Sequence, residues 1–258
     1  MAPVRMLAWR AAFLIAVLVL WELASGRLVA PLFISRPGEV AVKLWAMVAN
    51  GSLAFHASYT AIHALAGFAL GAAVGMAFGL ALGRWNRVAE VLDPFLMGFY
   101  SVPKIALAPL FILWFGVGTE MKVLFVAMIV FLLVFLNTYT GVRNVSREQI
   151  TILRLMRASE AQIMRKVVLP SAVTWVFAGL RLSVPYALIG AIMGEMLASN
   201  RGLGFMLADA TAQFDTGGAF AGLIAIIIMA MLLNGAVRLA ERVTMPWKSA
   251  ESERELSF

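Results

Sequence analysis

The chain has 258 residues, of which 62% are hydrophobic and only 14% are charged. Soluble domains carry about 25% charged residues, so this composition excludes a soluble protein and indicates one that crosses a membrane several times. The absence of cysteine excludes a disulfide, a thiolate metal site and a cysteine nucleophile. In a membrane protein, the net charge of +7 first suggests basic cytoplasmic loops rather than a nucleic-acid partner.

Apolar runs of membrane-spanning length predict an all-α, polytopic membrane protein with about six spans in one permease domain, residues 1–258. The predicted spans are 7–25, 57–83, 92–115, 121–142, 171–197 and 217–240. The first run is long for a signal-peptide core and lacks a convincing cleavage site, so we expect a first span. We also expect two short helices outside the spans, one starting near Pro37 on the outer membrane surface and one at 205–213.

The distribution of Lys and Arg predicts that both termini are cytoplasmic. In this orientation 14 cations lie inside, namely Arg5, Arg10, Arg84, Arg87, Arg143, Arg147, Arg154, Arg157, Arg165, Lys166, Arg238, Arg242, Lys248 and Arg254. Outside lie 5, namely Arg27, Arg36, Lys43, Lys122 and Arg201. Only Lys104 and Arg181 remain within spans.

The second span carries a glycine at every fourth position. These residues are Gly67, Gly71, Gly75, Gly79 and Gly83. Small residues at this spacing let helix backbones approach closely in lipid, so we predict a tight packing seam. A flexible gating helix is the secondary interpretation.

Prolines and two cations make the third and fifth spans candidates for lining the translocation path. Pro103 and Pro109 interrupt the third span beside Lys104, and Arg181 lies within the fifth. A charge deep in a membrane normally faces protein or water, and unpaired cations there would favour an anionic substrate. Alternatively, Lys104 reaches the cytoplasmic interface and Arg181 caps carbonyls of a neighbouring helix. We favour the alternative, because Lys104 follows a proline at which the span could begin.

No sequence pattern indicates catalysis. A GxxxxGK[ST] loop is absent, so any ATP that drives this protein is hydrolysed on another chain. His56 and His63 have no acidic or cysteine partner nearby in the sequence, which favours packing or hydrogen bonding over a metal site. We therefore expect no catalytic residue, no metal and no cofactor in this chain.

The segment 143–170 is the only long basic stretch in the apolar sequence, and it predicts two short helices. Ser146 with Gln149, and Ser159 with Gln162, both fit a capping box. Pro170 predicts that the second helix stops at or before it. Such a loop offers a surface to a partner; the alternative is an ordinary basic cytoplasmic loop.

Several stretches resemble permease subunits of bacterial ABC importers, in the nitrate, taurine and alkanesulfonate branch. The matching stretches are 103–110, 114–116, 141–145, 167–170 and Gly202-Leu203-Gly204 following Glu195, and the resemblance covers roughly residues 7 to 247. Two features of the family's cytoplasmic loop are missing. Its Glu-Ala-Ala falls at Thr151, Ile152 and Leu153, and its glycine falls at Arg157. With Arg157 there, either the turn avoids the left-handed conformation or the helix runs on into Ala158 before breaking at Ser159.

The resemblance implies an inner-membrane importer. A pair of these subunits, expected to be a homodimer, would form the path; two cytoplasmic ATP-binding subunits would hold ATP and magnesium; and an external solute-binding protein would deliver the solute. The implied ATPase-docking residues are Ser146, Gln149, Thr151, Ile152, Arg154, Leu155, Met156, Arg157, Ser159, Leu169 and Pro170.

The resemblance leaves the substrate open. The branch suggests a small anion such as a sulfonate, taurine or nitrate, although relatives also carry uncharged or aromatic cofactor precursors. A secondary transporter or channel working alone is a second class, but no inverted repeat and no midplane carboxylate is evident. A membrane scaffold without a transport role is a third.

Overall fold

The computed structural model describes residues 3–30 and 32–244, and within these ranges the regular structure is entirely helical. In chain order the elements are α1 (Pro3–Ala24), α2 (Pro37–Ala49), α3 (Ser52–Arg84), α4 (Asn86–Ser101), the 3-10 turn η1 (Lys104–Leu107), α5 (Ala108–Phe115), α6 (Thr119–Arg143), α7 (Arg147–Leu155), α8 (Glu160–Ile163), the π-helical turn η2 (Met164–Val168), α9 (Leu169–Ala198), α10 (Leu203–Ala212) and α11 (Thr216–Thr244). The all-α, multi-span prediction is confirmed. Lys248 and Arg254, two of the cations assigned to the cytoplasm, lie outside the described residues.

Five stretches within the described ranges are long and apolar enough to cross a membrane. They are Arg5–Ala24, Ser52–Arg84, Thr119–Arg143, Glu160–Ala198 and Thr216–Thr244. A sixth span exists only if the bent pair Glu90–Ser101 and Lys104–Phe115 is counted as one. The count is therefore five or six, and the predicted span 92–115 is divided by a sharp bend at the prolines that were expected to interrupt it.

The bend in that pair has a local cause. The two arms meet at 82°. Between them Val102 adopts an extended conformation, with φ −66° and ψ 129°, as expected for a residue that precedes a proline. Pro103 cannot donate a helical hydrogen bond, and Pro109 occupies the first turn of α5, where a missing donor costs nothing. The prolines therefore break the helix rather than merely kinking it.

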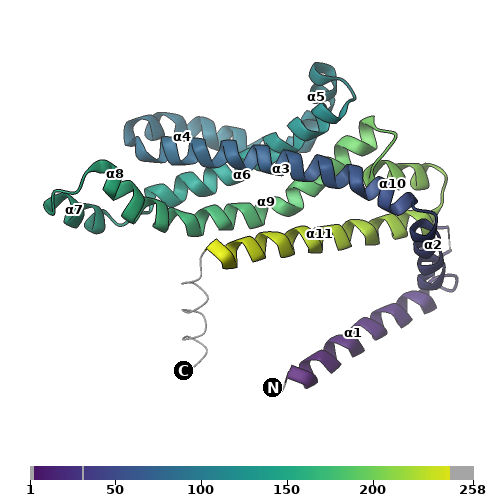
Figure 1. The fold of residues 1–258 in the computed structure, drawn as a ribbon. Coiled ribbons are helices and arrows are strands. Elements are labelled where there is room, and N and C mark those ends of the chain that lie inside the picture. The colour runs from purple at the N-terminus through teal and green to yellow at the C-terminus, as the bar shows by residue number, and fades with distance from the viewer. Residues whose placement is uncertain (1–2, 31, 245–258) are drawn as a thin grey trace.

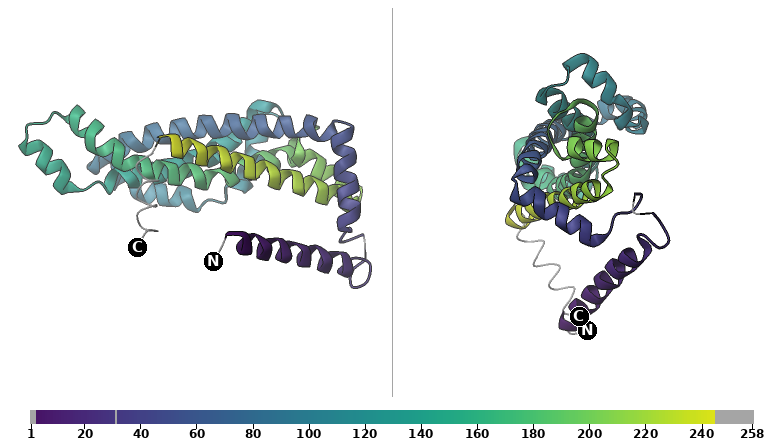
Figure 2. Two further views of the ribbon diagram at one scale, coloured as in Figure 1. Left: turned by 60° about the horizontal axis from the view of Figure 1, so that its bottom comes forward. Right: turned by 90° about the vertical axis from the view of Figure 1, so that its right-hand side faces the viewer.

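The core of the protein is the contact between α3, α6 and α9, which run side by side along its length (Figure 1). Small residues of α3 and α9 meet valines of α6, and the cluster they form is Ala64, Ala72, Val126, Val130, Val134, Ala187, Leu188 and Ala191. Helix α11 lies alongside this bundle, whereas the apolar window of α1 is entirely unburied and the helix diverges from the bundle (Figures 1 and 2).

The short elements gather at opposite ends of the bundle. Helices α7 and α8 lie beyond one end, and α2 and α10 lie at the other (Figures 1 and 2). The two short helices expected from the sequence are thus present as α2 and α10. Lys43 of α2 donates a hydrogen bond of 2.8 Å to Asp215, which precedes α11. This bond, together with the N–H of Gly218, lowers the pKa of the Asp215 carboxyl.

Candidate functional site

The loop between α6 and α9 presents one face of α7 to the outside and packs the other inward. Ile152 is 56% exposed, Leu155 80% and Met156 72%. On the opposite face, Ile150 and Leu153 pack against a buried cluster that ties the loop to α6 and α9. The exposed apolar edge, defined here as Ile152, Leu155 and Met156, lies at the tip of the molecule.

The two predicted caps are formed unequally. The Ser146 hydroxyl accepts from the Gln149 N–H at 3.3 Å, but the reciprocal bond is not formed, so the first capping box is only half present. The second is complete: the Ser159 hydroxyl accepts from the Gln162 N–H, and the Gln162 side chain accepts from the Ser159 N–H. Both caps start helices where the sequence predicted starts.

The second loop helix does not stop at Pro170, so that prediction is wrong. Helix α8 continues through the π-helical turn η2 into α9, giving an uninterrupted stretch Glu160–Ala198. Pro170 is the second residue of α9, directly after η2, so its missing N–H leaves one helical hydrogen bond of this continuous stretch unmade. The wider π turn before it accommodates the proline ring without ending the helix. Leu169 and Pro170 therefore belong to a spanning helix and not to a loop end.

Both expectations for the turn at Arg157 are wrong as well. Arg157 has φ +57°, in the left-handed region that the family's glycine would occupy. Helix α7 ends there in a Schellman motif: the Arg157 N–H donates to the Arg154 carbonyl and the Ala158 N–H donates to the Leu153 carbonyl, both at 2.9 Å. These two bonds, and the packing of Leu153 and Ala158 in one cluster, hold an arginine in a conformation that favours glycine.

Two acidic residues, Glu160 and Asp93, pair with arginines at the α7 end of the molecule. Glu160 accepts from Arg84 of α3 at 3.1 Å and from Arg154 of α7 at 3.2 Å, so it links the loop to the end of α3. Arg143 contacts Asp93 at 3.4 Å and donates to the Tyr139 hydroxyl at 2.7 Å. Arg154 is therefore already partnered within the chain.

Lys104 and Arg181, the two cations considered for the translocation path, both bind partners within this chain. The Arg181 Nη2 donates to Glu241 of α11 at 2.5 Å, so Arg181 is neither the unpaired cation nor, as favoured from the sequence, a residue that caps carbonyls of a neighbouring helix. The pair was missed because Glu241 lies just beyond the predicted sixth span. Lys104 donates to the Tyr100 carbonyl at 2.7 Å across the break at Pro103, with its Nζ 4.6 Å from the Tyr100 ring centre. Pro103 and Pro109 lie at this same break.

The five glycines of α3 all face α6. A Cβ on Gly67 would lie 2.5 Å from the Val126 Cβ, and one on Gly79 would lie 2.6 Å from the Thr138 Cβ. Gly71, Gly75 and Gly83 meet successive turns of the same helix. The stripe is the line along which the α3 and α6 backbones make their closest approach.

A buried polar cluster joins α3 to the end of α9, and it was missed at the sequence level. Glu195 has no exposed surface; one carboxylate oxygen accepts from the His63 Nδ1–H at 2.7 Å. The other accepts from the Thr60 hydroxyl at 2.8 Å and the Gly204 N–H at 2.9 Å. His63 thus makes a hydrogen bond, as the sequence favoured, but to an acidic partner 132 residues away in the chain. We call Thr60, His63, Glu195 and Gly204 the Glu195 cluster.

The two glycines that follow Glu195, Gly202 and Gly204, leave the space that the Glu195 side chain occupies. Gly202 has φ +105°, and a Cβ there would collide with the Glu195 carboxylate. A Cβ on Gly204 would lie 2.8 Å from the Glu195 Cβ. Thr60 and His63, three residues apart on one face of an apolar helix, were the available signal in the sequence.

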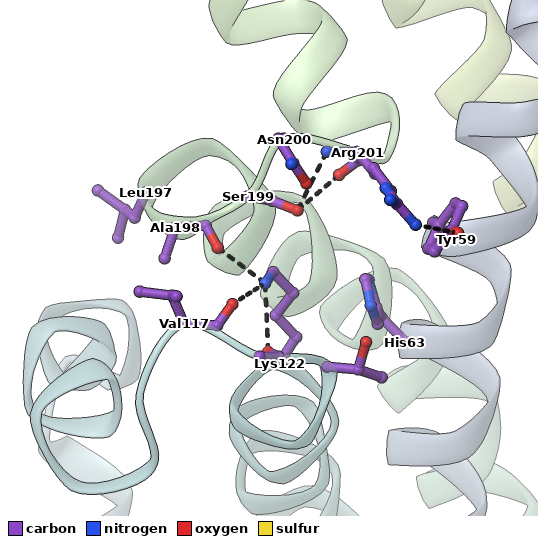
Figure 3. A pocket seen from close by; sticks show the side chains of 11 residues that line it. Tyr59, His63, Val117, Lys122, Leu197, Ala198, Ser199, Asn200 and Arg201 are labelled. Carbon is purple, nitrogen blue, oxygen red and sulfur yellow. Dashed lines mark hydrogen bonds between the residues drawn. The ribbon is translucent and has the colours of Figure 1, made fainter.

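A pocket of about 550 Å³ lies next to the cluster, between the ends of α3, α6 and α9 (Figure 3). We call it the Lys122 pocket; residues 59 and 63, 117–119 and 122, and 197–201 line it. Lys122 is only 3% exposed, and its Nζ donates to the carbonyls of Val117, Gly118 and Ala198 at 2.8, 3.2 and 2.8 Å. Carbonyl oxygens thus take all three donors of the Lys122 ammonium at the pocket wall.

Residues 67–245 match the family described as binding-protein-dependent transport system inner membrane component. The riboflavin transport system permease protein of Chloroflexus aurantiacus is 34% identical over 238 residues, 92% of this chain and 89% of that relative. The taurine transport system permease protein of Escherichia coli is 32% identical over 238 residues, 89% of this chain and 85% of that relative.

A solved chain of the MetNI methionine ABC transporter, in an inward-facing form, shares the fold. Its TM-score is 0.60 at 17% identity, over 77% of this chain and 96% of that one. The family model and the two relatives confirm the resemblance drawn from the sequence. The chain belongs to the family of binding-protein-dependent transport system inner membrane components.

Proposed function

We propose that the chain is the non-catalytic permease subunit of an ATP-driven importer in the bacterial inner membrane. Separate ATP-binding subunits hold ATP and magnesium on the cytoplasmic side, a solute-binding protein delivers the solute from outside, and a second copy of this chain completes the path. Both termini are cytoplasmic, which puts α7 and α8 inside. Family membership and the apolar helices support this proposal.

The observation that carries the proposal is the exposed apolar edge of α7. Three large apolar side chains stand free on a short helix at the tip of the molecule, while its other face is fixed by packing. Exposed apolar patches rimmed by polar residues mark protein interaction sites, and an amphipathic helix enters a groove by its apolar face. We assign this edge to a groove on the ATP-binding subunit.

The continuity of α8, η2 and α9 supports a mechanical coupling. Because Glu160–Ala198 is one uninterrupted helical stretch, a displacement of the loop passes into the membrane without a flexible joint. The Glu160 bonds to Arg84 and Arg154 add a second connection to α3. Approach of the two ATP-binding subunits would thus move α3 and α9 of both copies and reorient the path.

The test is co-purification with the ATP-binding subunit of the same transporter. Leu155→Asp places a charge at the most exposed position of this apolar edge and should release the ATPase. Thr151→Glu, one turn earlier on the same helix, restores the glutamate that the family carries at this position and should retain the ATPase. The native complex should contain two copies of this chain. If Leu155→Asp binds as well as the native chain, α7 is not the docking surface.

The solute is proposed to be a small anion, with an uncharged cofactor precursor as the second candidate. Relatives named for taurine and for riboflavin represent the two classes. A stand-alone secondary transporter would keep working when cellular ATP is depleted with the ion gradient intact. Loss of uptake under that condition supports the importer.

A further inference from the structure

We propose that the Lys122 pocket is a binding site for a small organic anion, with Arg201 and Lys122 supplying the positive charge. The inference deepens the proposed function, because such an anion entering from the α2 and α10 end would be the transported solute. It rests on four features of the pocket: its two cations, the fixed position of Arg201, an apolar wall and an unused histidine nitrogen.

The guanidinium of Arg201 stands at the pocket with most of its donors unused. Its Nη1 donates to the Tyr59 hydroxyl at 2.6 Å, and its carbon lies 5.2 Å from the Tyr59 ring centre (Figure 3). Among the described residues this is the one hydrogen bond made by its side chain. A planar guanidinium presents paired donors that match carboxylate and sulfonate oxygens, and its remaining donors are available for that purpose.

Hydrogen bonds hold the loop that carries Arg201, both within the loop and to α3 and α9. The Ser199 hydroxyl accepts from the Arg201 N–H and donates to the Arg201 carbonyl. Beyond it, the N–H groups of Gly202, Leu203 and Gly204 donate in turn to His56, Thr60 and Glu195, at 3.1, 2.7 and 2.9 Å.

This loop anchoring explains why a buried carboxylate is present at the end of a membrane helix. A buried charge is costly unless it is fully hydrogen-bonded, and Glu195 achieves this with three donors from α3 and the first turn of α10. Arg201 therefore lies on a loop that is already ordered before a ligand arrives. Binding then carries no cost for ordering the loop, which favours affinity.

The pocket also offers features beyond charge. Val117, Leu197 and Ala198 form an apolar wall that suits a short hydrocarbon tail. His63, which lines the pocket and is 2% exposed, uses Nδ1 for Glu195, whereas its buried Nε2 has no hydrogen-bond partner. Among the described residues that line the pocket, Nε2 is thus the one buried side-chain atom left without a hydrogen-bond partner. Lys122 adds its charge through the pocket wall even though its three donors are engaged.

The experiment measures binding to the purified full-length chain in nanodiscs, without any ATP-binding subunit. Butane-1-sulfonate should bind saturably by isothermal titration calorimetry, and butyl methyl sulfone, which is similar in shape but uncharged, should not. Arg201→Gln should weaken sulfonate binding about tenfold or more, because a charged hydrogen-bond donor is lost. Leu197→Trp should weaken it by filling the pocket.

The matched control is Arg27→Gln, which removes an exposed arginine from the same end of the molecule, where α1 meets α2. It should leave the affinity unchanged, which separates a site from a general effect of net charge. Absent binding in the native chain, equal binding of sulfone and sulfonate, or equal losses in both arginine variants would each overturn the site. Uptake that survives ATP depletion would overturn the proposed function instead, while leaving this result intact.

Discussion

A Cβ atom on Gly75 of α3 would lie 2.8 Å from the carbonyl oxygen of Phe131 on α6. That oxygen belongs to helix backbone and cannot rotate away, so the two helices would have to separate. The same constraint recurs along the seam, and it explains why α3 and α6 form the most extensive helix contact in the described structure.

Gly75→Leu should therefore lower the thermal stability of the purified subunit. Overpacking a tight contact costs about 1–3 kcal/mol, and backbone contacts make the upper end the better expectation. The matched control is Gly235→Leu in α11, where an added Cβ meets nothing within 4 Å. Melting of the two variants in detergent should differ, with only Gly75→Leu destabilised. Equal melting temperatures would mean that α3 does not pack on α6 in the membrane.

The pairing of Arg181 with Glu241 changes what a substitution at Arg181 should do. If Arg181 only set a positive potential in a path, Arg181→Met would reduce uptake of an anion and leave assembly intact. Because Arg181 instead binds a carboxylate that is only 12% exposed, its removal should destabilise the contact of α9 with α11, by about 1–3 kcal/mol.

The double variant Arg181→Met/Glu241→Gln separates these two roles of Arg181. Removing the charge from Glu241 as well should recover part of the lost stability, measured as the melting temperature. Lys104→Met should leave stability nearly unchanged, since Lys104 bonds only to a carbonyl in its own segment. Reduced anion uptake by Arg181→Met at native stability would restore the electrostatic interpretation.

The extent to which the sequence predicted the molecule follows from the range of each interaction. Ser146 and Ser159 began helices as expected because a cap is a contact between residues three apart. The sequence also indicated the break at Pro103, because a proline acts on its immediate neighbours in the chain. It did not indicate the angle between the two helices that meet there. Glu195 and His63 are 132 residues apart, and Glu241 and Arg181 are 60 apart, so no local pattern paired them. Arg157 was misjudged because an intrinsic preference for glycine was weighed without the Schellman bonds that outweigh it.

The opposite placement of α7 and the start of α11 allows a direct test of orientation. The native chain has no cysteine, so single cysteines can be introduced without further changes. Cysteine at Thr216 should react with a membrane-impermeant maleimide in intact cells, and cysteine at Ser146 should react only after the membrane is opened. The reverse pattern would place α7 outside and remove it from any cytoplasmic ATPase.

The last prediction concerns Arg157, the residue that stands where the family carries glycine. A side chain in the left-handed region costs roughly 1–2 kcal/mol relative to glycine. Replacing arginine by glycine removes this cost, but the greater freedom of glycine in the unfolded chain offsets part of the gain in stability. Arg157→Gly should therefore stabilise the loop by about 1 kcal/mol, seen as slower hydrogen exchange at the Schellman amides of Arg157 and Ala158.

Arg165→Gly is the matched control, since Arg165 lies in the helical turn η2 and glycine there should destabilise by about 1 kcal/mol. The opposite signs of the two substitutions identify the conformation at residue 157. If both arginine-to-glycine variants speed exchange, Arg157 does not occupy the left-handed region in the membrane, and the motif that ends α7 is formed in another way.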